Sequence, residues 1–147
     1  MNNQVPHPGL YPVHIDGRYG YINSTGKVVV PYQFDHADAF SEGLASIRVG
    51  RKTGFIDING NVAITPRFDW AEAFSDGLAR VQVNDLWGFA DPSGNVVVEP
   101  QFVKALDYRQ GFAAVKANGK WGYINKSGRW AIEAEWDDAQ CYSCGLG

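Results

Sequence analysis

A spacing of 34 residues runs through almost the whole chain and constrains its fold more than any other feature of the sequence. Three columns of glycines carry the repeat. The first begins a Gly-aromatic-aliphatic triplet, the second lies six residues later, and the third precedes Leu or Phe: Gly20, Gly54, Gly88 and Gly122; Gly26, Gly60, Gly94 and Gly128; Gly9, Gly43, Gly77, Gly111 and Gly145. We therefore predict four repeat units after a tail at residues 1–8, with a truncated fifth unit beginning at 145–147. The four units are 9–42, 43–76, 77–110 and 111–144.

Each unit contains the pattern of three short strands. The first strand alternates, as at 78–83, where Ala79, Val81 and Val83 share one face. Two turn residues follow: Asp16-Gly17, Gly50-Arg51, Asn84-Asp85 and Asn118-Gly119. Asp-Gly and Asn-Gly are typical of a type I′ hairpin. The second strand carries the triplet and ends in an Asx-x-x-Gly turn, and the third is rich in β-branched residues. The pattern predicts a three-stranded antiparallel meander.

A short helical turn is expected after each meander, at residues 34–40 and 68–74. Asp35 and Asp69 stand where a helix N-cap would lie. Acidic residues three positions later complete an approximate capping box, and Gly43 and its equivalents would end the turn as left-handed residues. Residues 103–110 lack the capping Asp, so we expect that helical turn to be looser and locally basic.

The motifs together resemble the WG-repeat (KWG) family. The resemblance rests on Lys120-Trp121-Gly122-Tyr123-Ile124, on the Asx-x-x-Gly turn and on the Phe-Asp-x-Ala-x-x-Phe-Ser-x-Gly-Leu-Ala stretch, and it covers residues 9–147. Tyr19 and Thr53 replace the tryptophan found at Trp87 and Trp121. The resemblance implies a bacterial, non-catalytic repeat scaffold and provides no catalytic residues.

Units of this size cannot bury their apolar faces alone, so neighbouring units must pack together. The fold class expected is an all-β repeat protein of four meanders, each with its helical turn, stacked as an open curved array. The alternative is a closed four-bladed propeller-like ring. Propeller blades usually have four strands, so three strands per unit favour the array.

Composition and charge exclude several functions. The net charge is −3, from 13 Lys and Arg against 16 Asp and Glu, which argues against a nucleic-acid partner. No apolar run reaches the roughly 20 residues of a membrane span, and residues 1–8 lack a signal peptide's features, so we expect a cytoplasmic protein with no membrane partner. Cys141 and Cys144 form a C-x-x-C pair, but no second pair of ligands has zinc-site spacing. We therefore predict no metal and no cofactor.

The sequence favours no enzyme. The histidines occur only at positions 7, 14 and 36, and neither a phosphate-binding glycine loop nor a zinc-hydrolase motif is present. Capping of turns and helix ends explains the carboxylates of Asp35, Asp57, Asp69 and Asp91, so they need not be catalytic groups.

Fifteen of the twenty aromatic residues (5 Trp, 7 Tyr and 8 Phe) fall into four columns of the repeat. The columns are Tyr19, Trp87 and Trp121; Tyr21, Phe55, Phe89 and Tyr123; Phe34, Phe68, Phe102 and Trp136; Phe40, Phe74, Tyr108 and Tyr142. Residues that recur at a fixed place in every unit are most simply its core. The alternative is an exposed ladder that stacks on sugar rings, for which Tyr19, Trp87 and Trp121 are the candidates.

Two columns vary between units and are better candidates for a binding surface. The first follows the predicted capping position, and the second lies on the polar face of the first strand: His36, Trp70, Lys104 and Asp138; His14, Arg48, Gln82 and Lys116. Trp70 is a plausible anchor for a partner. The second column would make a mildly basic stripe, most simply a solvated face.

These patterns predict a scaffold that binds another protein, as an adaptor or as an inhibitor by occlusion. The residues proposed for the contact are His36, Trp70, Lys104, Arg109 and Asp138. The alternative function is a carbohydrate-binding module that uses the aromatic ladder. The sequence leaves the oligomeric state open.

Overall fold

The computed structural model describes residues 9–136, and its regular structure there is entirely antiparallel β, without a helix. The strands are β1 (Leu10–Ile15), β2 (Arg18–Asn23), β3 (Val28–Phe34), β4 (His36–Ala37), β5 (Leu44–Val49), β6 (Lys52–Asp57), β7 (Val62–Phe68), β8 (Trp70–Ser75), β9 (Leu78–Val83), β10 (Leu86–Ala90), β11 (Val96–Phe102), β12 (Lys104–Ala105), β13 (Phe112–Ala117), β14 (Lys120–Asn125) and β15 (Trp130–Trp136).

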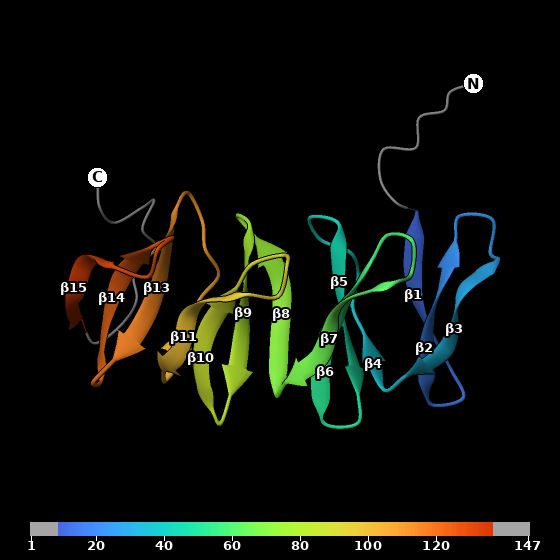
Figure 1. Cartoon of the computed structure of the whole chain (residues 1–147), viewed down its shortest axis with the longest axis horizontal. Helices are drawn as coiled ribbons and strands as arrows, with labels where there is room; N and C mark the ends of the chain where they lie inside the picture. Colours follow the sequence, from blue (N-terminus) through green and yellow to red (C-terminus); the bar gives the residue numbers. More distant parts are fainter. Residues whose placement is uncertain (1–8, 137–147) are drawn as a thin grey trace, which may run out of the picture. The chain divides into compact units, whose positions relative to one another are not determined.

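The described strands form four separate sheets, and the meander is confirmed in each. The first sheet has the order β1-β2-β3. The other three have a fourth strand at the edge beside the meander's first strand: β4-β5-β6-β7, β8-β9-β10-β11 and β12-β13-β14-β15. The chain divides into two compact units, residues 1–73 and 74–147, with the boundary inside β8. Figure 1 shows the strands of each unit.

The tight turns between the first and second strands follow the prediction in three repeats. Both turn residues have positive φ, as type I′ requires, at Asp16-Gly17, Asn84-Asp85 and Asn118-Gly119. In the remaining repeat Gly50 has φ 63°, while Arg51 is not among the described residues with positive φ.

The Asx-x-x-Gly turns are confirmed in all four repeats. Asn23 Oδ1 accepts the backbone N–H groups of Thr25 and Lys27, and the Gly26 N–H donates to the Asn23 carbonyl at 2.9 Å. Asp57, Asp91 and Asn125 make the equivalent bonds. Each glycine is left-handed, with φ between 84° and 90°.

The predicted helical turns are wrong. The segments that join successive meanders, here called linkers (residues 35–43, 69–77 and 103–111), instead supply the fourth strands β4, β8 and β12. The Asp35 N–H donates to the Arg48 carbonyl at 2.8 Å, and the Asp38 N–H donates to the Ser46 carbonyl at 3.0 Å. Seven residues cannot offset the cost of nucleating a helix, whereas the edge of the next meander already offers backbone acceptors.

The residues assigned to helix caps stabilise turns. Asp35 Oδ2 accepts the Gly50 N–H at 2.6 Å, in the turn after β5. Gly43 is left-handed as expected, but it forms a two-residue hairpin turn with Glu42 (φ 84° and 53°). Ser41 and Leu44 exchange both backbone hydrogen bonds across that turn. Helix caps and hairpin turns thus require the same residue types at these positions.

The glycine of the triplet is required by close approach of the third strand. A Cβ at Gly20, Gly54 or Gly88 would overlap the carbonyl of Val30, Ile64 or Val98. The pairing register shifts at the same place, because the third strand carries extra residues there. A side chain at this position would push the two strands apart.

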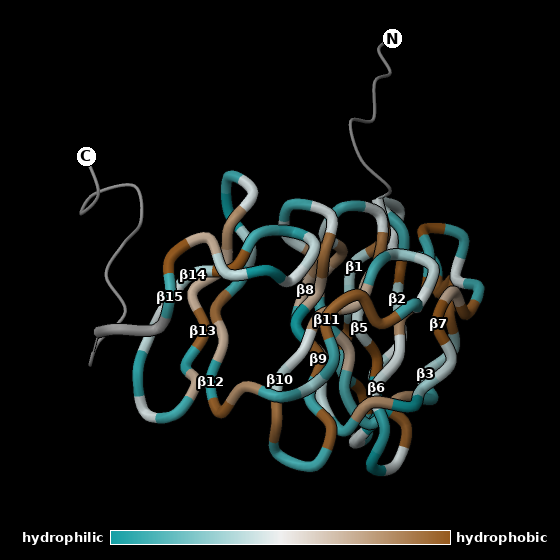
Figure 2. Tube along the Cα trace, turned by 60° about the vertical axis from the view of Figure 1, so that its left-hand side comes forward, coloured by the Kyte–Doolittle hydropathy of each residue, from teal (hydrophilic) through white to brown (hydrophobic). Residues whose placement is uncertain are grey.

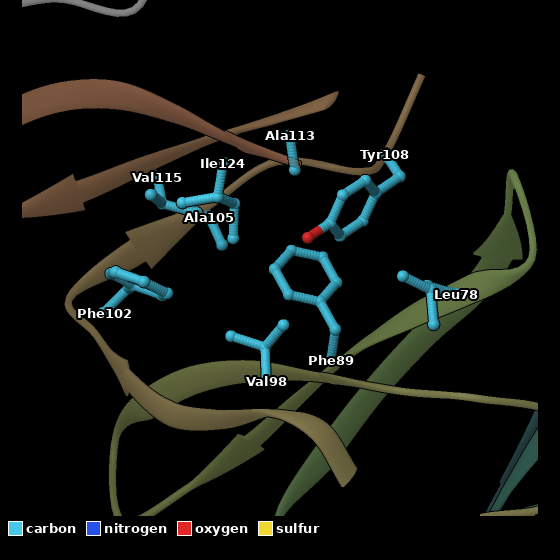
Figure 3. Packing of buried hydrophobic residues seen from close by; sticks show 9 residues of the cluster. All are labelled: Leu78, Phe89, Val98, Phe102, Ala105, Tyr108, Ala113, Val115 and Ile124. Atoms are coloured by element: carbon cyan, nitrogen blue, oxygen red, sulfur yellow. The ribbon is translucent and has the colours of Figure 1, made fainter. Parts of the chain in front are cut away.

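Each unit has a core of recurring side chains. In residues 1–73, Tyr21, Val30 and Phe34 of the first sheet pack with Ala45, Ile47 and Ile56 of the second. In residues 74–147, the Phe89 ring meets Tyr108 edge to face, 4.6 Å between centroids, among residues of both sheets (Figure 3). Hydrophobic and hydrophilic residues are mixed along the strands, without a strict alternation (Figure 2). The prediction that the recurring aromatic residues form the core is confirmed for the columns of Tyr21 and Phe34 at the described positions.

Two buried tyrosines hold neighbouring segments by their hydroxyls. Tyr21 donates to the Asp38 carbonyl, and Tyr108 donates to the Asn125 carbonyl, each at 2.6 Å. Burial raises the pKa of the Tyr21 phenol well above its usual 10, and the Asp38 carboxylate raises it further. Burial likewise raises the pKa of Tyr108.

We predict that Gly88→Ala lowers the free energy of unfolding by about 2–4 kcal/mol, because its Cβ would overlap backbone atoms that cannot move independently. Urea unfolding followed by tryptophan fluorescence measures the change. Gly17→Asn is the control, because Gly17 is left-handed with open space around it and asparagine tolerates that conformation. Equal effects of the two substitutions would contradict the close-approach explanation.

Alkaline pH should destabilise the fold through Tyr21 and Tyr108. A raised folded-state pKa means that the stability is present below pH 10 and is lost as pH rises toward the folded value. Between about pH 8 and pH 11, each tyrosine should remove about 1.4 kcal/mol. Tyr21→Phe or Tyr108→Phe should flatten the measured decline, whereas Tyr11→Phe, at a side chain that is exposed, should not. An unchanged slope in both core variants would disprove the effect.

Candidate functional site

The two variable columns of the sequence meet in register. In residues 1–73, His36 of β4 lies opposite Arg48 of β5. In residues 74–147, Lys104 of β12 lies opposite Lys116 of β13. The pairing of a linker with the following first strand therefore places the two varying columns next to each other in the sheet. The first of these places is the candidate functional site, because aromatic and imidazole rings gather there.

A row of rings crosses the strands of residues 1–73. His14 stacks on Tyr19, its cross-strand partner, with 4.5 Å between centroids. His36 lies between Tyr19 at 5.4 Å and Trp70 at 5.9 Å. The Arg48 guanidinium lies over the Trp70 ring at 5.1 Å, within the range of a cation–π interaction. We call these five residues the ring row.

Hydrogen bonds fix the polar atoms of the ring row. The Trp70 indole Nε1–H donates to Glu72 Oε2 at 2.6 Å. His36 Nε2 lies 3.0 Å from Asp38 Oδ1. Arg48 Nη1 donates to the Asp69 carbonyl at 3.3 Å. His36 and Trp70 are half-buried, so part of each ring faces solvent in a held orientation.

The geometry around Asp38 is not that of a catalytic triad. Asp38 binds His36 through Oδ1 and accepts the Ser46 hydroxyl through Oδ2 at 2.6 Å. A nucleophilic serine must donate to the imidazole, with the carboxylate behind it. Here the carboxylate stands between the two, so the imidazole cannot take the serine proton. Within residues 9–136, no three His, Cys, Asp or Glu residues gather as a metal site would require.

Thr53 is an irregular position beside the ring row. It lies opposite Arg48 in register and occupies the column of Tyr19, Trp87 and Trp121. Its side chain is buried, and Oγ1 has no hydrogen-bond partner. Since threonine offers no ring to stack on, Arg48 has no counterpart of the His14–Tyr19 stack and lies over Trp70 instead.

The remaining predicted contact residues lie apart from the ring row along the chain. Lys104 and Arg109 are exposed, and Arg109 belongs to the hairpin turn before Phe112. Asp138, Cys141 and Cys144 lie outside the described residues. The helical turn expected to be loosened at 103–110 is absent.

Arg80 fixes the third linker (residues 103–111), which lacks the aspartate found at the start of the other two linkers. Its Nε donates to Asp107 at 2.7 Å, its Nη1 donates to the Ala105 carbonyl at 2.8 Å, and its guanidinium lies over the Trp87 ring at 5.3 Å. This linker is therefore tied to the sheet rather than loosened.

The structure gives little support to an exposed aromatic ladder. Trp121 is 9% exposed, and Phe55 and Phe89 are fully buried. Tyr19 and Trp87 are half-buried, Tyr19 under His14 and Trp87 under Arg80. Sequence analysis missed the part played by Arg48, whose column was interpreted as a solvated stripe. Its signal was the small Thr53 opposite it in the hairpin.

The family model of the WG containing repeat matches the chain four times, at residues 19–52, 54–87, 87–121 and 121–147. The chain belongs to the WG-repeat family. The matches confirm the resemblance seen in the sequence and the number of four repeats. No curated protein sequence matches the chain. No helix in the described part of this WG-repeat chain is long and apolar enough to span a membrane.

We predict that Thr53→Val raises the free energy of unfolding by about 1 kcal/mol, because valine keeps the shape and removes a buried, unpaired hydroxyl. Thermal or urea unfolding measures this. Thr65→Val on β7 is the control, since Thr65 is exposed. A destabilised Thr53→Val variant would mean that the hydroxyl has a partner in solution.

Proposed function

We propose that the chain is a non-catalytic repeat scaffold that binds another protein through the ring row, as an adaptor or as an inhibitor by occlusion. The observation that carries the proposal is the fixed orientation of the half-buried Trp70 side chain. Its indole N–H is hydrogen-bonded to Glu72, and the Arg48 guanidinium lies over its ring. Tryptophan and arginine are the residues most enriched at the centres of protein interfaces. A ring already fixed in one orientation loses little conformational entropy on binding.

The variable positions support a partner-specific surface. His36, Arg48 and Trp70 belong to columns that the repeat does not dictate, while the recurring aromatic columns supply the core. Lys104 and Arg109 would add a second, basic contact. Lys104 lies directly opposite Lys116, and like charges in that arrangement destabilise a sheet. An acidic partner surface would relieve that repulsion. Asp138 remains a proposed contact residue.

We propose in addition that the protein is not an enzyme and needs no cofactor or metal. The Asp38 carboxylate lies between Ser46 and His36, so the imidazole cannot activate the serine, which supports this part of the proposal. A bacterial, cytoplasmic setting is likewise proposed, as an extension of the family resemblance.

We further propose that the sheets stack as an open curved array rather than a closed ring. The repeat length supports the array, because each unit has 34 residues, whereas a propeller blade usually has about 40 or more. Small-angle scattering of the full chain tests this, because an extended array and a compact ring of equal mass differ in radius of gyration.

The protein-binding proposal is tested by affinity capture from lysate of the source cell and then by direct titration of the captured protein. Trp70→Ala should weaken the affinity by about 30-fold, as loss of a central interface residue does. Lys104→Glu should weaken it less, by about tenfold, through the lost charge. Circular dichroism checks that both variants fold.

Trp130→Ala is the matched control, because Trp130 is another partly exposed tryptophan outside the ring row. An unchanged affinity of both Trp70→Ala and Lys104→Glu would place the contact elsewhere. Retention on polysaccharide resin, with no protein captured, would favour the carbohydrate-binding alternative.

A further inference from the structure

The chain contains two Asn-Gly pairs, and the fold holds them differently. They are Asn59-Gly60, in the turn between β6 and β7, and Asn118-Gly119, in the turn between β13 and β14. In such a pair the glycine nitrogen can attack the asparagine side-chain amide, because glycine has no side chain to hinder the approach. Asparagine is accordingly among the thermolabile residues of proteins. In a folded chain the reaction requires that this nitrogen and this side chain are free.

The first pair is held by its turn. The Gly60 N–H donates to the Asp57 carbonyl at 2.9 Å, and the Asn59 N–H donates to Asp57 Oδ1 at 2.9 Å. Gly60 also lies so close to Val30 that an added Cβ would stand 2.8 Å from its side chain. Val30 is part of the buried core of its unit. The nitrogen of Gly60 is therefore occupied, and the turn must open locally before it can react.

The second pair lacks these restraints. Asn118 and Gly119 are the central residues of a type I′ turn, with φ of 53° and 78°, and both are exposed. The hairpin is closed by the flanking pair of Ala117 and Lys120, and the two central N–H groups take no part in that pairing. Among the described residues, neither the Gly119 N–H nor the Asn118 side chain has a hydrogen-bond partner. A Cβ added at Gly119 would meet nothing within 4 Å.

We propose that Asn118 deamidates spontaneously in the folded protein. The Gly119 nitrogen forms a bond to the Asn118 side-chain amide carbon and loses its proton to solvent. The bond from that carbon to the amide nitrogen breaks, and ammonia leaves. Water then opens the resulting cyclic succinimide at either carbonyl. The products are aspartate, with the original backbone, and isoaspartate, in which the backbone runs through the former side chain.

The two products differ in their effect on the hairpin. Asp16-Gly17 forms the equivalent turn of the first sheet, with φ of 53° and 82°, so aspartate at position 118 keeps the type I′ turn. Isoaspartate adds a methylene group to the backbone, and loop length fixes the register of a hairpin. The pairing of β13 with β14 is therefore loosened next to the turn. Val115 and Ile124 of these strands belong to the core of the second unit, so that unit loses stability as the protein ages.

Ageing of the full chain at mildly alkaline pH tests the proposal, with the first pair as an internal control. Deamidation replaces an NH group by oxygen, so mass spectrometry of chymotryptic peptides follows Asn118 and Asn59 separately. We expect Asn118 to react at least about tenfold faster than Asn59 in the folded chain, because Asn59-Gly60 must first lose the hydrogen bonds of its turn. In concentrated urea the two rates should converge, because neither pair is then held.

Equal rates at the two pairs in the folded chain would overturn the proposal. A difference that persists unchanged in urea would overturn it as well, because the neighbouring residues rather than the fold would then select Asn118.

Asn118→Gly is the matched variant for the effect on the hairpin, because glycine accepts the positive φ of this turn and has no amide to lose. We expect the aged natural chain, enriched in isoaspartate, to unfold at a lower urea concentration than the fresh chain. Asn118→Gly should age without a change in its own midpoint, and fresh Asn118→Asp should unfold where the fresh natural chain does. An aged natural chain as stable as the fresh one would overturn the loosening of the hairpin. These measurements involve no binding partner, so failure here is separable from failure of the proposed function.

Discussion

The pairing of a linker with the next meander is the interaction on which the rest of this structure depends. A three-stranded meander has two edges and an apolar face, and a repeat unit of this size buries that face by packing against its neighbours. The bonds from Asp35 and Asp38 to the carbonyls of Arg48 and Ser46 attach one meander to its successor. They also bring Ala37 into the core beside Ile47. The same bonds recur in the second unit, so the repeat spacing reflects a repeated junction as well as a repeated sheet.

The ring row is a direct consequence of that junction. Pairing of the linker with β5 places His36 opposite Arg48, and the linker's own carboxylate, Asp38, then holds the imidazole. The Tyr21 hydroxyl fixes the carbonyl of Asp38 from the core side. Thr53 departs from the aromatic column of the repeat at the one place where Arg48 lies over Trp70. Functional surfaces tend to occur where a sequence departs from its local pattern. Here the departure is Thr53, which replaces an aromatic residue in its column of the repeat.

The sequence was sufficient for most of the fold because its signals are local. Asp16-Gly17 and Asn23 to Gly26 specify their turns through their own φ preferences and side-chain hydrogen bonds. The prediction of a helical turn was wrong because an Asp followed by a left-handed glycine is compatible both with a helix cap and with a hairpin turn. Only the edge of the following meander decides between them, and no window of the sequence around Asp35 contains it. Trp70, His36 and Arg48 all belong to columns that vary, but the contact of Arg48 with Trp70 depends on tertiary register and is not visible in either column.

The sequence by itself determined the repeat period, the meander, the turn types and the aromatic core, because each depends on residue preferences within one unit. The requirement for glycine at Gly54 and Gly88, the strand pairing of the linkers and the gathering of His14, Tyr19, His36, Arg48 and Trp70 were decided only by the tertiary structure. These features arise where backbones of different strands approach, and close approach is a property of the folded chain rather than of any residue in it.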